Sequence, residues 1–171
     1  MSLPYIEENF ISSDECQRLI DFADANKKEN VSRDDVYSTE IEWIDHGATY
    51  YGNNVDPVTA ESDDDAVIKV TEKCKTFADC ELIYAGVVRW PVGTFMNPHY
   101  DNSKKNDIYD IFAAMLYLND DFNGGHTGFE NFEITPKTGQ LCIFSNSQYK
   151  HHVTKVEDAE RFVLSFWYNN A

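Results

Sequence analysis

Hydrophobic and polar residues alternate in short runs along the second half of the chain, and these runs predict β-strands. Successive side chains of a strand point to opposite faces, so this alternation is typical of strands with one buried face. Turn residues such as Asn123-Gly124-Gly125 and Pro136-Lys-Thr-Gly139 separate the runs. The predicted strands are Glu81–Trp90, Phe95–Tyr100, Ile108–Asn119, Thr127–Ile134, Gln140–Ser145, His151–Val156 and Phe162–Tyr168.

The first half of the chain carries two patterns typical of amphipathic helices. Ser12 and Glu15 form a capping-box pattern, and the apolar residues that follow recur at helical spacing. A second helix is predicted from Asp63 to about Phe77, because aspartates begin it and lysines end it, as the helix dipole favours. A short strand is predicted over Tyr5–Phe10, and residues 26–59 are irregular in pattern.

Two helices followed by seven or eight short strands indicate an α+β fold, in which helices support a β-barrel or jelly roll. A chain of 171 residues with 42% hydrophobic residues is large enough for one core. We therefore predict a single domain over residues 1–171, with a helical N-terminal part over 1–80 and a barrel core over 81–171.

Composition narrows the range of partners and locations. The net charge is −16, and the 14 Lys and Arg residues form no basic run, so no nucleic-acid partner is expected. No apolar run reaches the roughly 20 residues of a membrane span, and the N-terminus lacks the pattern of a signal peptide. The four cysteines form no Cys-x-x-Cys pair, which is typical of buried free thiols. We expect a cytoplasmic protein with no membrane partner, and the oligomeric state stays open.

The candidate chemistry centres on His99 and Asp101. Because residues i and i+2 of a strand share a face, this pair can direct an imidazole nitrogen and a carboxylate oxygen at one point. A histidine from the pair His151-His152 would complete two histidines and one carboxylate, a set that suits non-haem Fe(II) with open coordination positions. The alternative is that His99 and Asp101 are solvated loop residues, since this spacing arises easily by chance.

Five segments occur in a characteristic order along nearly the whole chain: NFISSDECQRLIDFA, RWPVGTFMNPHYD, MLYLNDDFNGGHTGF, ITPKTGQLCIF and KHHVTKVEDAERFVLSFWY. Together they resemble the Fe(II)- and 2-oxoglutarate-dependent dioxygenases of the prolyl 4-hydroxylase type. The resemblance implies a double-stranded β-helix and hydroxylation of an aliphatic C–H bond, with a peptide or protein proline as the expected substrate. It also implies Fe(II), 2-oxoglutarate as cosubstrate, and dioxygen, with ascorbate as an optional addition.

The resemblance assigns the catalytic metal ligands to His99, Asp101 and His151. The family pattern His-x-Val-x-x-Val fits His151 and not His152, and neighbouring strand residues cannot both point inward. Trp90 stands where a tyrosine is frequent in the family, and Met96 stands where an aromatic residue is frequent. His126 replaces a common acidic residue.

Arg161 and Tyr117 match the family residues that bind the distal carboxylate of 2-oxoglutarate. A buried carboxylate is costly unless it is hydrogen-bonded, and a guanidinium offers two parallel hydrogen bonds to it. Alternation puts the odd-numbered residues from Arg161 to Trp167 on one face, expected to be the barrel interior. The alternatives are a surface ion pair for Arg161 and a plain core position for Tyr117.

Other functions remain open at the level of sequence. The substrate could be a free amino acid or another small molecule, and a cupin-like metal-binding protein would need neither Arg161 nor Tyr117. A nucleic-acid demethylase of the same superfamily would carry a second arginine after Arg161, which is absent. We also expect residues 36–59 and 102–107 to close over the substrate, although the aromatic residues of the first stretch could instead form a satellite core.

Overall fold

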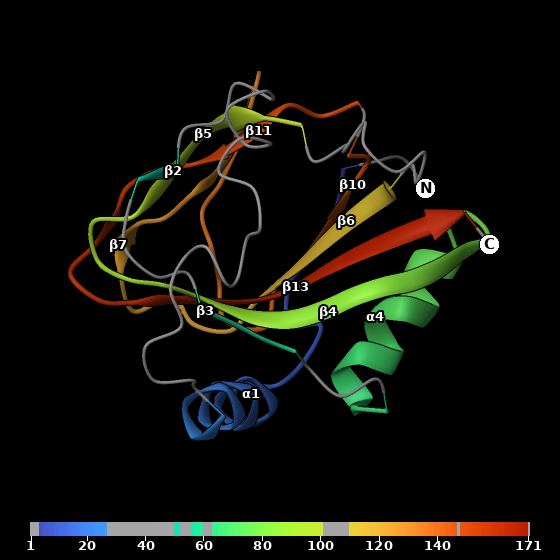
Figure 1. The fold of residues 1–171 in the computed structure, drawn as a ribbon, viewed down its shortest axis with the longest axis horizontal. Helices are drawn as coiled ribbons and strands as arrows, with labels where there is room; N and C mark the ends of the chain where they lie inside the picture. Colours follow the sequence, from blue (N-terminus) through green and yellow to red (C-terminus); the bar gives the residue numbers. More distant parts are fainter. Residues whose placement is uncertain are drawn as a thin grey trace.

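The described residues form two antiparallel β-sheets that face each other and a smaller two-stranded ribbon, and two described helices lie on the outer side of the larger sheet (Figure 1). The computed structural model describes residues 4–26, 50–51, 56–59, 63–100, 110–146 and 148–170. The helices are α1 (Ser13–Ala25) and α4 (Asp65–Lys75). The strands are β1 (Tyr5–Glu7), β2 (Tyr50–Tyr51), β3 (Asp56–Thr59), β4 (Cys80–Trp90), β5 (Phe95–His99), β6 (Asp110–Tyr117), β7 (Asn123–Gly124), β8 (Thr127–Phe129), β9 (Glu133–Ile134), β10 (Leu141–Phe144), β11 (His151–Val153), β12 (Val156–Glu157) and β13 (Arg161–Asn170).

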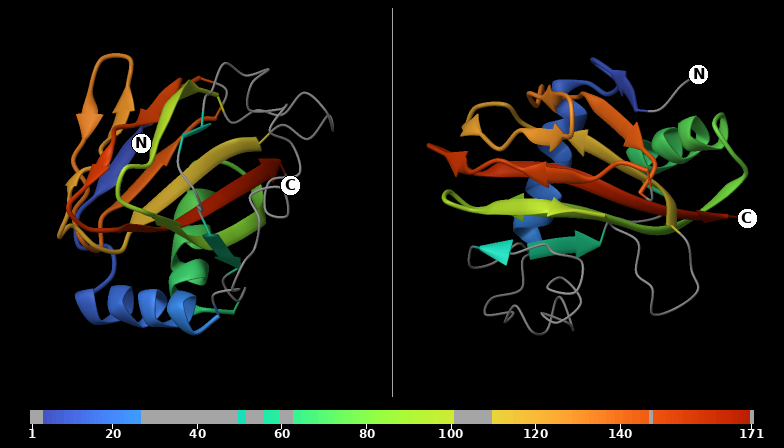
Figure 2. Two further views of the ribbon diagram at one scale, coloured as in Figure 1. Left: turned by 60° about the vertical axis from the view of Figure 1, so that its left-hand side comes forward. Right: turned by 90° about the horizontal axis from the view of Figure 1, so that it is seen from above.

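Strands far apart in the sequence lie side by side in both sheets. The larger sheet has the order β1-β10-β6-β13-β4-β3, and the smaller has the order β2-β5-β11-β8-β9. A separate ribbon pairs β12 with β7. Figure 2 shows the N-terminal strand β1 alongside the strands of the second half of the chain, where it pairs with β10. This arrangement confirms the predicted α+β fold with a jelly-roll barrel.

The larger sheet is buried on both faces, because one face meets the helices and the other faces the smaller sheet. Leu116 and Leu164 belong to the outer core, which also contains Leu19 of α1 and Val70 of α4. Side chains on the other face of the larger sheet belong to the inner core. This core combines residues from both sheets: Ala113, Tyr117, Phe129, Ile134, Cys142, Phe144 and Val163. Burial on both faces explains why β10 is apolar at all four positions.

Each of the two described helices begins after a side chain that caps its N-terminus. The predicted capping box of α1 is present: Ser12 Oγ accepts from the Glu15 backbone, and the Glu15 carboxylate accepts from the Ser12 backbone. Asp64 caps α4 by accepting a hydrogen bond from the Ala66 backbone. Arg18 of α1 also donates two hydrogen bonds to the Asp64 carboxylate, and this ion pair joins the two helices.

Most predicted strands agree with the structure to within two residues at each end, and three differ by more. The predicted strand Thr127–Ile134 is two strands, because the chain reverses where the Phe129 N–H donates to the Phe132 carbonyl. The predicted strand His151–Val156 also divides, since β12 leaves the smaller sheet to pair with β7. The first predicted strand ends at Glu7 instead of Phe10.

The four cysteines are buried and free, as predicted. None of the helices in the described ranges has the length and apolar character needed to cross a membrane. Residues 36–59 and 102–107, which we expect to close over the substrate, lie mostly outside the described residues. Their described parts, β2 and β3, pair with β5 and β4 and so belong to the two sheets.

Candidate active site

His99 and His151 lie directly opposite each other on the neighbouring strands β5 and β11. Opposed residues of an antiparallel pair have Cβ atoms only about 5 Å apart, and here the two imidazole centroids are separated by 4.3 Å. Both side chains are buried, with 2% of His99 and 6% of His151 exposed. Strand pairing therefore brings together two of the three predicted metal ligands.

A backbone carbonyl fixes the orientation of each imidazole. His99 Nδ1 lies 2.8 Å from the carbonyl oxygen of Asn97, and His151 Nδ1 lies 3.3 Å from that of Tyr149. A carbonyl can only accept, so each Nδ1 carries the proton and the lone pair is on Nε2. A histidine that ligates a metal through Nε2 needs this tautomer and this support.

The third predicted ligand, Asp101, lies outside the described residues. Within the described ranges, no group of three His, Cys, Asp or Glu side chains has the arrangement of a metal site. The described part of the chain therefore supplies the two imidazoles, and Asp101 follows His99 by two positions in the sequence. The donor chemistry of the pair fits a first-row transition metal such as Fe(II).

Arg161 begins β13 and is buried, with 1% of its surface exposed. Its guanidinium carbon lies 5.1 Å from the ring centroid of Trp90 and 5.5 Å from that of Tyr117. Its Nη2 lies 3.3 Å from Thr127 Oγ1 as a donor, whereas its Nε has no hydrogen-bond partner. The alternative of a surface ion pair is therefore wrong.

Tyr117 and Thr127 complete a polar cluster with Arg161. The Tyr117 hydroxyl donates a 2.7 Å hydrogen bond to Thr127 Oγ1. Neither Tyr117 nor Thr127 has any exposed surface. Burial raises the pKa of the Tyr117 phenol well above its usual value, so the hydroxyl keeps its proton. The cluster thus presents protonated donors in an apolar interior.

Burial lowers the pKa of Arg161 to about 10, because removal from water disfavours the charged form. The guanidinium still carries its charge at neutral pH. Among the described residues, no ion pair neutralises it. A buried cation with an unsatisfied N–H is costly, so the arrangement suits a ligand that supplies an anion.

One cavity of about 70 Å³ connects the histidine pair with Arg161. Its lining includes both histidines of the pair, His99 and His151, and Arg161 of the polar cluster. The odd-numbered residues of β13 from Arg161 to Trp167 all line it, as the alternation predicted. Most of the remaining lining is apolar: Val88, Trp90, Met96, Ala113, Ala114, Met115, Phe144, Val153 and Phe166.

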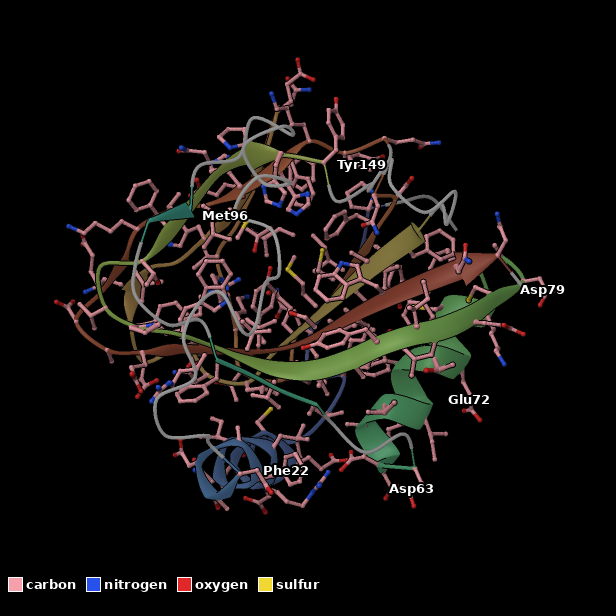
Figure 3. The ribbon with its side chains drawn as sticks, in the orientation of Figure 1. Phe22, Asp63, Glu72, Asp79, Met96 and Tyr149 are labelled. Atoms are coloured by element: carbon pink, nitrogen blue, oxygen red, sulfur yellow. The ribbon has the colours of Figure 1, made fainter. Side chains whose placement is uncertain are left out.

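The cavity lies in the part of the barrel away from the helices. In Figure 3, Met96 of β5 and Tyr149, which precedes β11, lie on the side of the molecule opposite Phe22 of α1 and Glu72 of α4. The helices therefore pack on the outer face of the larger sheet, and the two histidines lie on the smaller sheet, away from the helices.

Two histidines outside the pair have separate surroundings. His152 is half-buried, and its imidazole lies across Gly128 of the neighbouring strand β8. His126 Nδ1 lies 2.5 Å from Glu133 Oε1, and the imidazole is partly exposed on the loop between β7 and β8. Neither lines the cavity.

The sequence names Thr127 only as the first residue of a predicted strand and assigns it no role in the site. Its hydroxyl is the shared partner of Tyr117 and Arg161. Thr127 is opposite Val153 in the ladder between β8 and β11. The one local signal was a polar residue within an apolar strand, and that signal does not identify a partner.

Comparison with known proteins supplies a family. Residues 85–169, about half the chain, match the family model described as 2OG-Fe(II) oxygenase superfamily. This region contains both histidines of the pair, Asp101, Tyr117 and Arg161. A protein of Acanthamoeba polyphaga mimivirus, provisionally named as a prolyl 4-hydroxylase, is 28% identical over 103 residues. The match covers 48% of this chain and 43% of the mimivirus protein, so the chain spans less than half the length of that relative.

Solved structures share the whole fold. A viral collagen prolyl hydroxylase from Paramecium Bursaria Chlorella virus-1, solved as a complex with 2OG, is 19% identical with a TM-score of 0.74. The match covers 99% of this chain and 97% of that one. A prolyl-4-hydroxylase of Pseudomonas putida is also 19% identical, with a TM-score of 0.68 and coverage of 98% and 92%. At this identity the likeness establishes the fold alone.

Proposed function

We propose that this chain, whose residues 85–169 belong to the 2OG-Fe(II) oxygenase superfamily, is an Fe(II)- and 2-oxoglutarate-dependent dioxygenase acting on peptide or protein proline. The proposed reaction is hydroxylation of the proline ring at carbon 4. The observation that carries the proposal is one cavity lined both by a histidine pair and by a buried arginine that has no acidic partner among the described residues.

The metal would be held by His99, Asp101 and His151. The two imidazoles are oriented through their Nδ1 protons, which leaves Nε2 as the ligating atom. Asp101 would add an anionic oxygen, consistent with its position after His99. Once bound, iron supplies the oxidation chemistry with dioxygen, and the chain supplies orientation and a dry cavity.

Arg161 and Tyr117 would bind the distal carboxylate of 2-oxoglutarate, with Thr127 between them. The guanidinium contributes charge and donors, and the phenol contributes a hydroxyl that burial keeps protonated. The ring of Trp90 covers the guanidinium from one side and so limits the access of water. A cupin-like protein without 2-oxoglutarate chemistry has no use for this polar cluster.

Proline as substrate rests on the relatives, since the mimivirus, algal-virus and bacterial proteins are all named as prolyl hydroxylases. The direct test is mass spectrometry of candidate proline peptides and of free amino acids after incubation with protein, Fe(II), ascorbate and 2-oxoglutarate. We expect a product one oxygen atom heavier from a proline peptide. A heavier product from free amino acids alone would assign a small-molecule hydroxylase instead.

A cytoplasmic location is part of the same proposal. Its support is the set of four buried free cysteines, since an oxidising compartment favours disulfides. Fractionation of cells that express the tagged protein tests it, and recovery from a secretory compartment would contradict it.

A further inference from the structure

The side chain of Asn119 binds the backbone on both sides of Arg161. Asn119 Nδ2 donates a 2.7 Å hydrogen bond to the carbonyl oxygen of Glu160, and the backbone N–H of Phe162 donates a 2.7 Å hydrogen bond to Asn119 Oδ1. One amide therefore holds the residue before Arg161 and the residue after it. Asn119 Nδ2 also lies 2.7 Å from Asp121 Oδ1, so its own orientation is fixed.

These hydrogen bonds lie where the ladder between β6 and β13 ends. The paired residues run up to Val163 opposite Tyr117. Beyond that pair, the Leu118 N–H donates to the Phe162 carbonyl at 3.0 Å, and the Asn119 side chain then replaces the missing ladder. The residues on either side of Arg161 are thus held to the segment that follows β6 by the Asn119 side chain, while Arg161 itself is opposite Trp90 of β4.

The stem of Arg161 has little freedom to compensate for a shift of its backbone. A Cβ added to Gly125 would lie 2.9 Å from Cδ of Arg161, so the stem passes close to this glycine. The guanidinium lies within 5.5 Å of the ring centroids of both Trp90 and Tyr117. The position of the charged group therefore follows from the position of the backbone.

We propose that Asn119 is a positioning residue for the cosubstrate site, which sets the depth of Arg161 in the barrel relative to Tyr117. Tyr117 and Asn119 are two positions apart in the sequence, so the segment that supplies the phenol also fixes the arginine. This inference rests on the proposed function, in which Arg161 and Tyr117 bind the distal carboxylate.

The test compares Asn119→Ala and Asn119→Asp with the wild-type protein. Asn119→Ala removes both flanking hydrogen bonds, whereas Asn119→Asp keeps an acceptor for the Phe162 N–H and loses the donor to Glu160. Asn123→Ala is the matched control, because the Asn123 side chain bonds Asp158 at the surface. The measurements are the dissociation constant of 2-oxoglutarate from the Mn(II)-loaded protein by calorimetry and hydrogen exchange of the Phe162 amide in the metal-free protein.

We expect Asn119→Ala to raise the dissociation constant of 2-oxoglutarate by roughly 10- to 100-fold, the scale found for residues that orient metal ligands from behind. Mn(II) affinity should be retained, and the Phe162 amide should exchange faster. Asn119→Asp should also raise the dissociation constant, because its carboxylate loses the donor to Glu160 and repels Asp121, while the Phe162 amide stays protected. This variant keeps the test usable if the alanine variant does not fold. Asn123→Ala should match the wild type.

Two results separate this inference from the proposed function. Wild-type 2-oxoglutarate affinity in both Asn119 variants, together with weakened binding in Arg161→Ala, would overturn the positioning role alone. Wild-type affinity in Arg161→Ala would overturn the carboxylate anchor and the positioning role with it. Equal loss of metal and cosubstrate binding in the Asn119 variants would also overturn the positioning role, since that pattern indicates a general disruption of the fold.

Discussion

Arg161 carries its charge into the interior of the barrel, where the described residues offer it aromatic rings and one hydroxyl. The free energy of a buried cation without an anion is unfavourable, and a single neutral hydrogen bond does not offset it. A residue of this kind lowers the stability of the unliganded protein. Its presence is explained if a ligand carboxylate completes the site.

Arg161→Met should therefore separate ligand binding from stability. We expect 2-oxoglutarate affinity to fall by roughly 30-fold to several thousand-fold, because losing a buried charged partner costs about 2–5 kcal/mol. The free energy of unfolding without ligand should stay equal or rise, since an apolar side chain of similar length replaces an unpaired charge. Calorimetry and urea denaturation measure the two effects.

The control for this prediction is Arg18→Met, which removes a half-exposed ion pair with Asp64 on the helix layer. It should leave cosubstrate affinity unchanged. A strong loss of stability in Arg161→Met without a change in cosubstrate affinity would make Arg161 a structural residue.

His151 and His152 are neighbours with opposite surroundings, since His151 lines the cavity and His152 crosses Gly128. We expect His151→Ala to lose Fe(II) binding and His152→Ala to keep it, because only His151 faces His99. Metal content after anaerobic loading provides the measurement. Loss of iron in His152→Ala, with retention in His151→Ala, would contradict the ligand assignment.

At the scale of elements, the helices act as a fixed support behind the larger sheet, and hydrogen bonds at their N-termini hold them in place. Glu15 combines two of these roles, since its carboxylate accepts from Ser12 of the capping box and from Lys69 of α4. The Lys69 hydrogen bond and the Ser12 bonds lower the pKa of Glu15 to about 2. Glu15 therefore links α1 with α4.

Glu15→Gln should cost about 0.5 kcal/mol of stability at neutral pH, because it removes the negative charge near Lys69 and the N-terminus of α1, while the glutamine oxygen still accepts from Ser12. A carboxyl group whose pKa is lowered on folding stabilises the protein above its unfolded pKa, near 4.5, and loses that contribution as pH falls toward 2. The difference between wild type and variant should thus shrink from pH 5 downward. Urea denaturation over this range measures it, and a difference independent of pH would contradict the assignment.

His152 of β11 packs against Gly128 of β8, next to the predicted metal ligand His151. A Cβ added to Gly128 would lie 2.1 Å from Cε1 and 2.2 Å from Nε2 of His152. We expect Gly128→Ala to lower stability by roughly 1–3 kcal/mol, as overpacking does, and to weaken metal binding through the shift of β11. The double variant Gly128→Ala/His152→Ala should recover both, because the alanine then has space. Failure of the double variant to recover would show that the glycine is needed for another reason.

At the scale of the whole molecule, the sequence predicts what depends on local pattern. Ser12 and Glu15 announce the start of α1, and the alternation from Arg161 to Trp167 gives the face of β13 that lines the cavity. These features follow from the periodicity of helices and strands. The resemblance to a family then predicts the arrangement of these elements as a double-stranded β-helix.

The roles of Thr127 and Asn119 could not be predicted, because each depends on contacts between residues distant in sequence. Thr127 meets Arg161 only through the pairing of β8 with β11, and Asn119 meets Glu160 only where the β6 ladder ends. The division of residues 127–134 into β8 and β9 was missed for another reason, since its turn contains no glycine or proline. The single-domain organisation over residues 1–171 and the role of Asp101 remain predictions.

If this chain uses dioxygen and 2-oxoglutarate together to hydroxylate proline, each product must receive one oxygen atom from dioxygen. The most direct measurement incubates the Fe(II)-loaded protein with 2-oxoglutarate, a proline peptide and dioxygen made of a heavy oxygen isotope, and analyses both products by mass spectrometry. We expect one heavy oxygen atom in succinate and one in the hydroxylated peptide, and we expect Arg161→Ala to form neither product at low cosubstrate concentration. Peptide hydroxylation that takes its oxygen from water, or that proceeds without consuming 2-oxoglutarate, would contradict the proposed function.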